Sequence, residues 1–421
     1  MNDAWIAAII FLFTYAIIVS ERVPRTTAAL AGGLLMILMG ILPQEEAFHA
    51  VDLNVLFLLT GMMVIAHLMS ETGLFQWLAV QTVRLSKGQP VQVMVLIALI
   101  TAIASAFLDN VTVVVLIAPV TLYVASTLGV SPIPFLITEV MASNIGGATT
   151  LIGDPPNILI ASRANIDFLQ FLLNMAPPAL LSLLAYMGIM VIQFRHALTV
   201  PPERQHMLMR LKTEGLITNP TLLGQTLAVL ALVIVGFLLH SVIHLEPATI
   251  ALSGATLLLL WTKRDPHAIF QHVEWATLMF FVGLFMAVEG LVVTGVIEHV
   301  AHVLVRLTAG NVRITTLFIL WFSALASGIV DNIPYTATML PIVETLGNVM
   351  PTRPLWWALA LGADLGGNLT LVGASANVVV ASIAERSGHK LTFGEFLRYG
   401  LATVTVSLLI SSVWLWFMYL S

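Results

Sequence analysis

The sequence predicts an all-α polytopic membrane protein made of two inverted five-helix repeats, each with a re-entrant hairpin and a broken helix. Its composition, the spacing of its apolar segments and an internal repeat predict this fold class. Hydrophobic residues make up 59% of the 421 residues and charged residues 9%, whereas soluble domains have about 45–50% and about 25%. This composition excludes a soluble enzyme, a nucleic-acid-binding protein and a disordered chain. The chain has no cysteine, which excludes disulfides, thiolate metal sites and a cysteine nucleophile.

The apolar segments predict ten membrane crossings and two hairpins, because a full span needs about 20 residues. Eight uninterrupted segments lie at roughly 4–20, 26–42, 53–70, 175–194, 221–240, 247–262, 275–293 and 399–420. Two more, at 133–163 and 356–384, are interrupted by Gly, Asn and Pro, and we expect broken helices there. The last two, at 91–127 and 314–349, would each be about 55 Å long as straight helices. We therefore expect each of them to fold back as a re-entrant hairpin.

The placement of Lys and Arg predicts the orientation, because basic residues are enriched in cytoplasmic loops. With the N-terminus outside, 13 of the 17 basic residues fall in the cytoplasm, Arg210 and Lys212 among them, and 4 fall outside. We expect a multi-pass protein of the cytoplasmic (inner) membrane with both termini outside. Its expected division is a first repeat over 1–194, a cytoplasmic linker over 195–220 and a second repeat over 221–421.

Two smaller expectations concern the ends of the spans. No basic residue precedes the first apolar segment, so we expect that segment to be a span and not a cleaved signal peptide. Tryptophans are enriched where a membrane protein meets the interface between lipid and water. We therefore expect the following tryptophans to form part of an interfacial belt: Trp356, Trp357, Trp414 and Trp416.

A repeated motif relates the two halves of the chain. Six residues recur 222 positions later: Gly61, Gly73, Ser105, Asp109, Asn110 and Pro119 return as Gly283, Gly295, Ser327, Asp331, Asn332 and Pro341. At a shift of 220, Asn144–Asn157 overlays Asp364–Asn377 with six of 14 positions identical. Five crossings in each repeat turn the second copy upside down. Inverted repeats of this kind build many secondary transporters.

Both 14-residue segments contain a Gly-Gly-x-x-Thr-Leu-x-Gly run, which predicts a break in the helix because glycine and proline destabilise helix interiors. Such breaks can be simple kinks, but irregular backbone at membrane depth is tolerated where it lines a cavity or is buried in protein. We expect the breaks and the hairpin tips to meet near the midplane and form a substrate and ion site. The expected site residues are Ser105, Asp109, Asn110, Asn144, Gly147, Thr149, Thr150, Asp154, Asn157, Ser327, Asp331, Asn332, Asp364, Asn368, Thr370, Ser375 and Asn377. Glu139 is a candidate proton relay, and we expect neither a metal site nor a cofactor.

The carboxyl groups in these elements predict cation or proton handling. Four aspartates lie in the hairpins and breaks: Asp109, Asp154, Asp331 and Asp364. Residues 91–162 contain no Lys or Arg, and residues 314–384 contain only Arg353, in a loop. Buried carboxylates without a cationic partner cannot all stay ionised, so we expect them to be protonated or to bind a cation.

Two structural alternatives remain open for these aspartates. Asp109 and Asp331 each precede the second helix of a hairpin, where an aspartate commonly accepts hydrogen bonds from the first backbone amides. Such a cap does not exclude ion handling, because the cap lies where the ion would bind. Asp154 stands beside Pro155 and is equally suited to ordering a turn.

The segment Asn144–Asn157, which ends in Gly-Asp-Pro-Pro-Asn, closely resembles the arsenite-permease and P-protein group of the ion transporter superfamily, as does Ser105-Ala-Phe-Leu-Asp-Asn110. This superfamily also contains NhaD-type sodium/proton antiporters and divalent-anion symporters. The resemblance covers essentially the whole chain. It implies a scaffold domain, a transport domain, two re-entrant hairpins, a homodimer and elevator-like alternating access, with a soluble ATPase as a candidate partner.

The resemblance also implies roles for individual residues. Asn110 and Thr150 would supply oxygen ligands in the first half, with Asn332 and Thr370 as their counterparts. The dicarboxylate symporters carry Ser-Asn-Thr at their hairpin tips, whereas this chain has Asp-Asn-Val and Asp-Asn-Ile. The added carboxyl groups disfavour a dianionic substrate, so anion or dicarboxylate symport is the least favoured function.

The favoured function is proton-coupled efflux of arsenite as arsenous acid, with antimonite as a further solute. Arsenous acid is mostly undissociated near neutral pH, and amide, hydroxyl and carboxyl groups can bind its hydroxyls. Sodium/proton antiport is the alternative, because midplane aspartates suit it equally. An intramembrane aspartyl protease is disfavoured because its Gly-x-Gly-Asp motif is absent, and paired hairpins favour a carrier over a passive channel. We therefore expect a transporter and not an enzyme, with a small inorganic solute, protons and the lipid bilayer as partners and no nucleic acid.

Overall fold

The computed structural model describes residues 2–20, 22–209 and 215–421, and these residues form helices and loops without a β-strand. Arg210 and Lys212 of the expected linker lie outside the described residues. The helices of the first half are α1 (Asn2–Ser20), α2 (Arg25–Leu38), α3 (Gln44–His49), α4 (Leu53–Ser70), α5 (Leu74–Leu85), α6 (Pro90–Ser105), α7 (Asn110–Leu128), α8 (Ile133–Gly147), α9 (Pro155–Ala164) and α10 (Phe168–Phe194). A short helix, α11 (Pro202–Met209), follows them.

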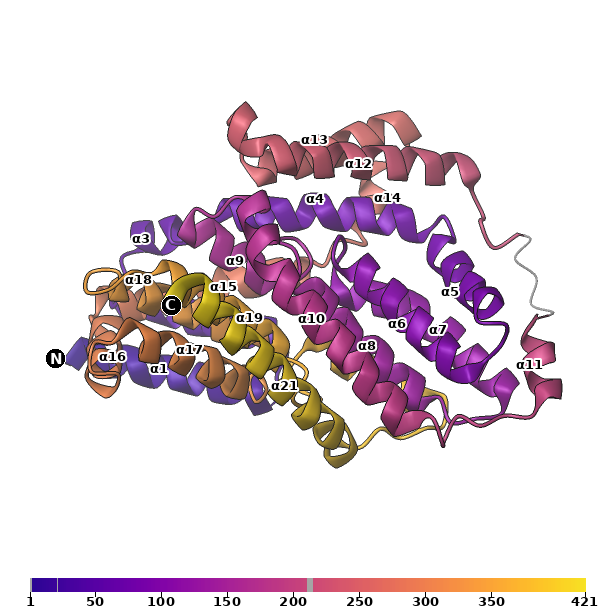
Figure 1. The fold of residues 1–421 in the computed structure, drawn as a ribbon. Helices are drawn as coiled ribbons and strands as arrows, with labels where there is room; N and C mark the ends of the chain where they lie inside the picture. The colour runs from indigo at the N-terminus through magenta and orange to yellow at the C-terminus, as the bar shows by residue number, and fades with distance from the viewer. Residues whose placement is uncertain (1, 21, 210–214) are drawn as a thin grey trace.

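The second half repeats this order of helices. Its helices are α12 (Pro220–Ile243), α13 (Pro247–Thr262), α14 (Pro266–Phe270), α15 (Trp275–Val293), α16 (Val296–Leu307), α17 (Val312–Ser327), α18 (Asn332–Leu346), α19 (Arg353–Gly366), α20 (Ser375–Arg386) and α21 (Phe393–Leu415), which ends in a π-helical turn, Trp416–Leu420. Helices α1 to α10 thus correspond one to one with α12 to α21. In Figure 1, α12 and α13 lie along α4 of the first half. The hairpins are α6–α7 and α17–α18, and the broken helices are α8–α9 and α19–α20. The predicted fold class is confirmed.

Among the described residues, seven helices are long and apolar enough to cross a membrane. An eighth span results if α16 and α17, which are separated by a bend of 115°, are counted together. This count includes α7, although α7 is one arm of a hairpin. It omits the short apolar helices α2 and α13. The broken helices are also omitted, because each of their parts is shorter than a span.

Six helices pack on one another as a frame: α1, α2, α4, α12, α13 and α15. Within it, α2 packs against α15, and α4 packs against α13, two crossings that the repeat relates. Glycines bring these helices close together. A Cβ atom on Gly61 would lie 2.6 Å from the carbonyl carbon of Ala251, and one on Gly283 would lie 2.4 Å from that of Ala29. The repeated glycines therefore set the spacing of the frame, as small residues do in many membrane proteins.

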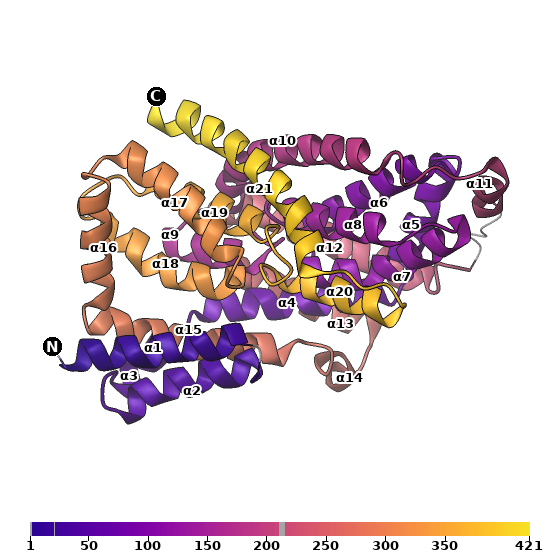
Figure 2. The same ribbon diagram turned by 90° about the horizontal axis from the view of Figure 1, so that it is seen from below.

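Two amphipathic arms, α5 and α16, connect the frame to the hairpins. Each begins after a glycine in the left-handed conformation, Gly73 with φ 78° and Gly295 with φ 76°. Glycine adopts this conformation without steric cost, which permits the sharp turn out of the preceding span. In Figure 2, α16 runs across the ends of α15, α17 and α18.

The inner helices α8 and α19 lie at the centre and are enclosed by protein. Every residue of α8 is buried, and so is every residue of α19 after Arg353. The expectation that Trp356 and Trp357 lie in an interfacial belt is wrong, because both side chains are buried and the Trp357 ring packs edge-on against Phe171. Trp416 is exposed, in agreement with a place in such a belt.

Replacing Gly146 by Ala is expected to destabilise the protein, because the added Cβ would lie 2.2 Å from the carbonyl oxygen of Ala102 on α6. Overpacking of this kind typically costs about 1–3 kcal/mol. Gly188→Ala is the matched control, since nothing lies within 4 Å of that Cβ position and alanine favours a helix over glycine by about 0.5–1 kcal/mol. Thermal unfolding in detergent should give a lower midpoint for Gly146→Ala only. Equal midpoints for the two variants would contradict the close packing of α6 on α8.

Candidate functional site

The two hairpin tips meet at one carboxyl group, that of Asp154. Asn110 at the first tip donates from Nδ2 to Asp154 Oδ2 at 3.0 Å. Asn332 at the second tip donates from Nδ2 to Asp154 Oδ2 at 3.2 Å and to Oδ1 at 3.3 Å. Asp154 directly precedes α9, is 2% exposed and makes no capping bond to that helix. Its side chain therefore joins the two repeats and is not a turn-forming group.

A network of side-chain amides continues from this carboxyl group into the core. Asn110 Nδ2 also lies 3.3 Å from Asn144 Oδ1. Asn144 Nδ2 donates to Asn368 Oδ1 at 2.9 Å and to Asn377 Oδ1 at 3.0 Å, and Asn368 Nδ2 donates to the Met141 carbonyl at 3.2 Å. All four of these asparagines are buried. The network thus brings together predicted site residues from both halves of the chain.

Each break in the inner helices is closed by one asparagine. Asn157 Nδ2 donates to the carbonyls of Gly147, at 3.2 Å, and Thr150, at 3.0 Å. Asn377 Nδ2 donates in the same way to the carbonyls of Gly367, at 2.8 Å, and Thr370, at 2.9 Å. These asparagines replace the hydrogen bonds that the interrupted helix no longer provides.

Hydroxyl groups tie the breaks to the hairpins. Thr150 donates to the Ala106 carbonyl, and Thr370 donates to the Gly328 carbonyl at 2.5 Å. The remaining predicted hydroxyls are bonded as follows: Ser105 to the Ser143 hydroxyl at 2.7 Å, Ser327 to the Ala363 carbonyl at 2.6 Å and Thr149 to the Gly146 carbonyl at 2.6 Å. In this conformation these hydroxyl protons stabilise the breaks and are not directed into a cavity.

Both hairpin-tip aspartates cap the helix that follows them. Asp109 Oδ2 accepts from the Thr112 backbone amide at 2.8 Å and from its hydroxyl at 3.1 Å. Asp331 Oδ1 accepts from the Ile333 amide at 3.1 Å. The N-cap interpretation is confirmed for both residues.

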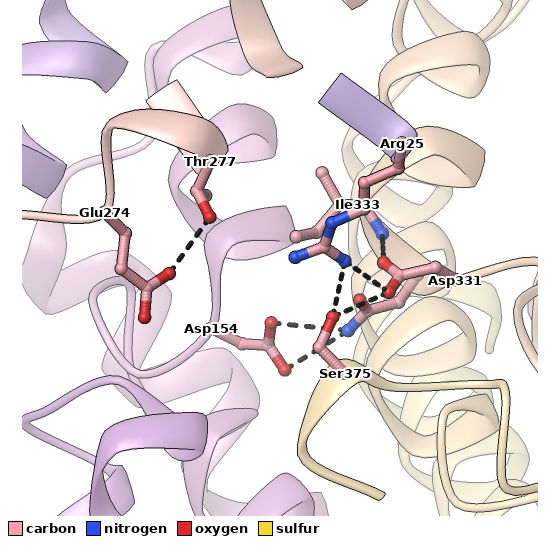
Figure 3. Close-up of polar contacts among 8 residues, drawn as sticks. Arg25, Asp154, Glu274, Thr277, Asp331, Ile333 and Ser375 are labelled. Carbon is pink, nitrogen blue, oxygen red and sulfur yellow. Dashed lines mark hydrogen bonds and ion pairs between the residues drawn. The ribbon is translucent and has the colours of Figure 1, made fainter. Parts of the chain in front are cut away.

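Asp331 differs from Asp109 in having a basic partner. Arg25 Nη1 lies 3.1 Å from Asp331 Oδ2 and donates to the Ser375 hydroxyl at 2.6 Å, while that hydroxyl donates to Asp331 at 2.8 Å (Figure 3). The expectation that the tip aspartates lack a cationic partner is therefore wrong for Asp331. The arginine comes from the start of α2, 306 residues earlier in the chain, so no local pattern indicated the contact.

A cavity of about 290 Å³ lies beside Asp154. Five predicted site residues line it: Asp109, Asn110, Asp154, Asn332 and Ser375. Residues that the sequence did not indicate also line it, among them Arg25, His67, His272, Glu274 and Thr277. The His67 and His272 rings stack with centroids 4.0 Å apart, and Thr277 donates to Glu274 at 3.0 Å. The nearest signal in the sequence was that Glu274 directly precedes the expected span 275–293 and Thr277 lies in its first turn.

Other predicted residues lie away from this cavity. Glu139, the candidate proton relay, is fully buried and accepts from the Thr121 hydroxyl at 2.5 Å. Asp364 and Asn157 are also fully buried between the inner helices and do not line the cavity. Across the residues that the structure describes, no group of three or more His, Cys, Asp or Glu side chains is arranged to hold a metal ion.

Arg25→Gln and Asp331→Asn are each expected to lower the stability of the protein. The loss of unfolding free energy in the double variant should be smaller than the sum of the two single losses, by about 1 kcal/mol. This coupling is modest because the ion pair is only partly buried and solvent weakens it. The side chains of Arg25 and Asp331 are 36% and 15% exposed. The more exposed pair Arg163–Glu344, at 47% and 53%, is the control and should show almost no coupling. Double-mutant cycles, built from unfolding in mixed micelles, measure the coupling energy of each ion pair. Additive effects of the Arg25 and Asp331 substitutions would contradict the ion pair between them.

Known proteins share both the sequence and the fold of this chain. The family model described as a citrate transporter, CitMHS, matches residues 15–362. An uncharacterized transporter of Mycobacterium tuberculosis is 45% identical over 98% of both chains, and a 46 kDa membrane protein of Mycobacterium leprae is 44% identical over 99% of both. The human P protein is 36% identical over 96% of this chain, which spans 58% of the P protein.

A solved structure shows the same fold at low sequence identity. The YdaH transporter of Alcanivorax borkumensis, described as having an unusual topology, superposes with a TM-score of 0.63 and 15% identity over 99% of this chain and 98% of that one. The P-protein match confirms the resemblance seen in the sequence. With hairpins, broken helices and a family match over most of its length, the chain belongs to the citrate transporter (CitMHS) family of secondary transporters, within the ion transporter superfamily.

Proposed function

We propose that this protein is a proton-coupled secondary carrier in which Asp154 exchanges protons as the solute binds and leaves. The observation that carries this proposal is the bonding of Asp154 to the asparagines of both hairpin tips. Among the described residues, no Lys or Arg forms an ion pair with Asp154, since Arg25 pairs with Asp331. An ionised carboxylate is costly near the midplane, so its charge must be neutralised when the binding site changes sides.

The charges of the cavity bear on the class of solute. Asp109, Asp154 and Glu274 line it, against the single cation Arg25, whose charge is already balanced by Asp331. An excess of carboxylates disfavours a free polyvalent anion and suits a neutral hydroxylated solute. We therefore propose arsenous acid as the solute, exported in exchange for protons, with antimonite as a close analogue. The citrate named by the family model would bind here only with its charge neutralised by protons or a divalent cation.

Sodium/proton antiport is the second candidate function. The same excess of carboxylates around the cavity favours it, because sodium and protons would compete for one anionic site. A carrier of arsenous acid has no need of sodium, so the two functions differ in the ion that discharges a pH gradient.

Transport into everted membrane vesicles tests the proposal. With a pH gradient and without sodium, the wild-type protein should take up arsenite, and added sodium should change the rate little. The same vesicles are given antimonite, citrate and citrate with Mg²⁺ as alternative solutes. Discharge of the gradient by sodium alone, without arsenite uptake, would favour the antiporter. Uptake of citrate but not arsenite would make the carrier one of organic anions.

Asp154→Asn is expected to reduce proton-coupled uptake to the level of empty vesicles, because the amide cannot exchange a proton. The protein should still insert and purify, since the side chain keeps its shape and one acceptor oxygen. Asp265→Asn is the matched control, an exposed aspartate that caps α14 and does not line the cavity. The control should transport at the wild-type rate. Wild-type transport by Asp154→Asn would remove the carboxyl group from the coupling mechanism.

We also propose the orientation that the basic residues predict, with repeats over 1–194 and 221–421 joined by a cytoplasmic linker. Glu274 and Ser70, which line the cavity just before α15 and at the end of α4, would then lie on the cytoplasmic side, as a carrier loaded for export requires. Because the chain lacks cysteine, Glu203→Cys and Ser421→Cys can each be labelled singly with an impermeant maleimide. Both positions are exposed, and they should label from opposite sides of the membrane. Labelling from the same side would contradict the ten-crossing topology.

A further inference from the structure

The asparagines that close the two breaks have fixed amide orientations. Each Nδ2 group donates to two backbone carbonyls, from Asn157 to those of Gly147 and Thr150 and from Asn377 to those of Gly367 and Thr370. Rotating either amide by 180° would place its oxygen against two carbonyl oxygens. The Oδ1 atom of each asparagine therefore points away from its own break and presents an acceptor.

In one half of the molecule this acceptor has a donor. Asn377 Oδ1 accepts from Asn144 Nδ2 at 3.0 Å. Asn144 belongs to α8 of the first repeat, so this hydrogen bond joins the two repeats. It also leaves no polar atom of Asn377 unpartnered.

In the other half the donor position is occupied by a carboxyl group. The 220-residue shift that relates the inner helices places Asp364 where the first repeat has Asn144. The same shift pairs Asp364 with Asn157 as Asn144 is paired with Asn377, so the Asp364 carboxyl group lies beside the Asn157 side chain. Asn157 Oδ1 and both oxygens of Asp364 lack a hydrogen-bond partner among the described residues, and both residues are 0% exposed. Three buried acceptor atoms thus lie together without a donor.

We propose that Asp364 is protonated and that its O–H donates to Asn157 Oδ1, which makes this pair a proton-binding site between the repeats. The proton stays covalently bound to Asp364 and replaces the N–H that Asn144 supplies in the other half. A proton is favoured over a metal ion because neither residue lines the cavity and a hydrogen bond needs no additional space. Protonation also removes a charge that could not be solvated at this depth.

The charges around Asp364 agree with a neutral acid. Asp154, at the start of α9, is the ionisable group that interacts with it electrostatically. Ionising two nearby buried carboxyl groups together is unfavourable. When Asp364 is protonated, Asp154 can therefore carry the negative charge. On the other helices packed against α19, Glu139 is bonded to Thr121, and Asp331 to Arg25. The remaining charged side chains of those helices lie at their outer ends: Arg163, Arg313, Glu344, Glu395 and Arg398.

The pH dependence of stability follows from this assignment. Aspartate is ionised in an unfolded chain above about pH 4, whereas the folded protein retains the proton. Over the pH range in which the folded state keeps this proton, it binds one proton more than the unfolded state. Stability then falls as the pH rises, by a factor of ten in the unfolding equilibrium per pH unit, and this slope ends where the folded state also loses the proton. The assignment of a proton to Asp364 does not depend on the proton-coupled transport proposed above.

Asp364→Asn tests the site, because its amide N–H can donate to Asn157 Oδ1 as Asn144 does to Asn377. Unfolding in mixed micelles is compared between pH 6 and pH 9 for the wild type, Asp364→Asn and Asp364→Ala. We expect Asp364→Asn to be at least as stable as the wild type at pH 8. The pH dependence of its unfolding equilibrium should be smaller than that of the wild type by the equivalent of one proton. Asp364→Ala should be less stable at every pH. These measurements use neither solute nor gradient, so their result is independent of the transport assay.

Infrared difference spectra give a second readout. A band from a protonated carboxyl group should be present in the wild type and in Asp154→Asn, and it should lose one component in Asp364→Asn. Failure of Asp364→Asn to fold, or stability as low as that of Asp364→Ala, would overturn the proposal. Stabilisation of the wild type by sodium chloride over choline chloride, absent in Asp364→Asn, would also overturn it by showing that the site binds sodium.

Discussion

The need to satisfy backbone groups where the inner helices break is the constraint on which the rest of the structure depends. Carbonyls that leave a helix at membrane depth find no water, so protein groups must bond them. Asn157 and Asn377 do this from within each broken helix, while Thr150 and Thr370 connect the breaks to the hairpins. The enclosing hairpins and the burial of α8 and α19 keep the bonded carbonyls of the breaks inside the protein.

Duplication supplied this framework twice, but the polar groups placed on it differ between the copies. Asp154 has Ala374 as its counterpart, and Asn144 has Asp364, while Asp109 and Asp331 are both present but only the latter has an arginine beside it. The backbone-bonding residues are the ones that the two repeats share. Carboxyl groups therefore distinguish two otherwise similar breaks. Both breaks contribute residues to the cavity lining, Ile152 and Asp154 from the first and Ala374 and Ser375 from the second. The two copies of a symmetric frame therefore present different charges to the same cavity.

The sequence predicted the features that depend on local pattern and on the repeat. The hairpins followed from segments too long for one span, the breaks from the duplicated glycines, and the caps at Asp109 and Asp331 from their position before a helix. It did not predict Arg25 at Asp331, because that contact joins residues 306 positions apart. The burial of Trp357 was missed for a related reason: the place of a tryptophan in an apolar segment does not show whether lipid or Phe171 lies beside it.

The complete enclosure of α8 and α19 separates the binding chemistry from the surrounding lipid. Only 22% of the residues in the spans of α1 and α12 are buried, so a thicker or thinner bilayer would act first on the tilt and length of these helices. The inner helices have no surface on which lipid could act directly. Relatives that inhabit membranes of different thickness could thus change the outer helices freely and retain the same broken helices at the centre.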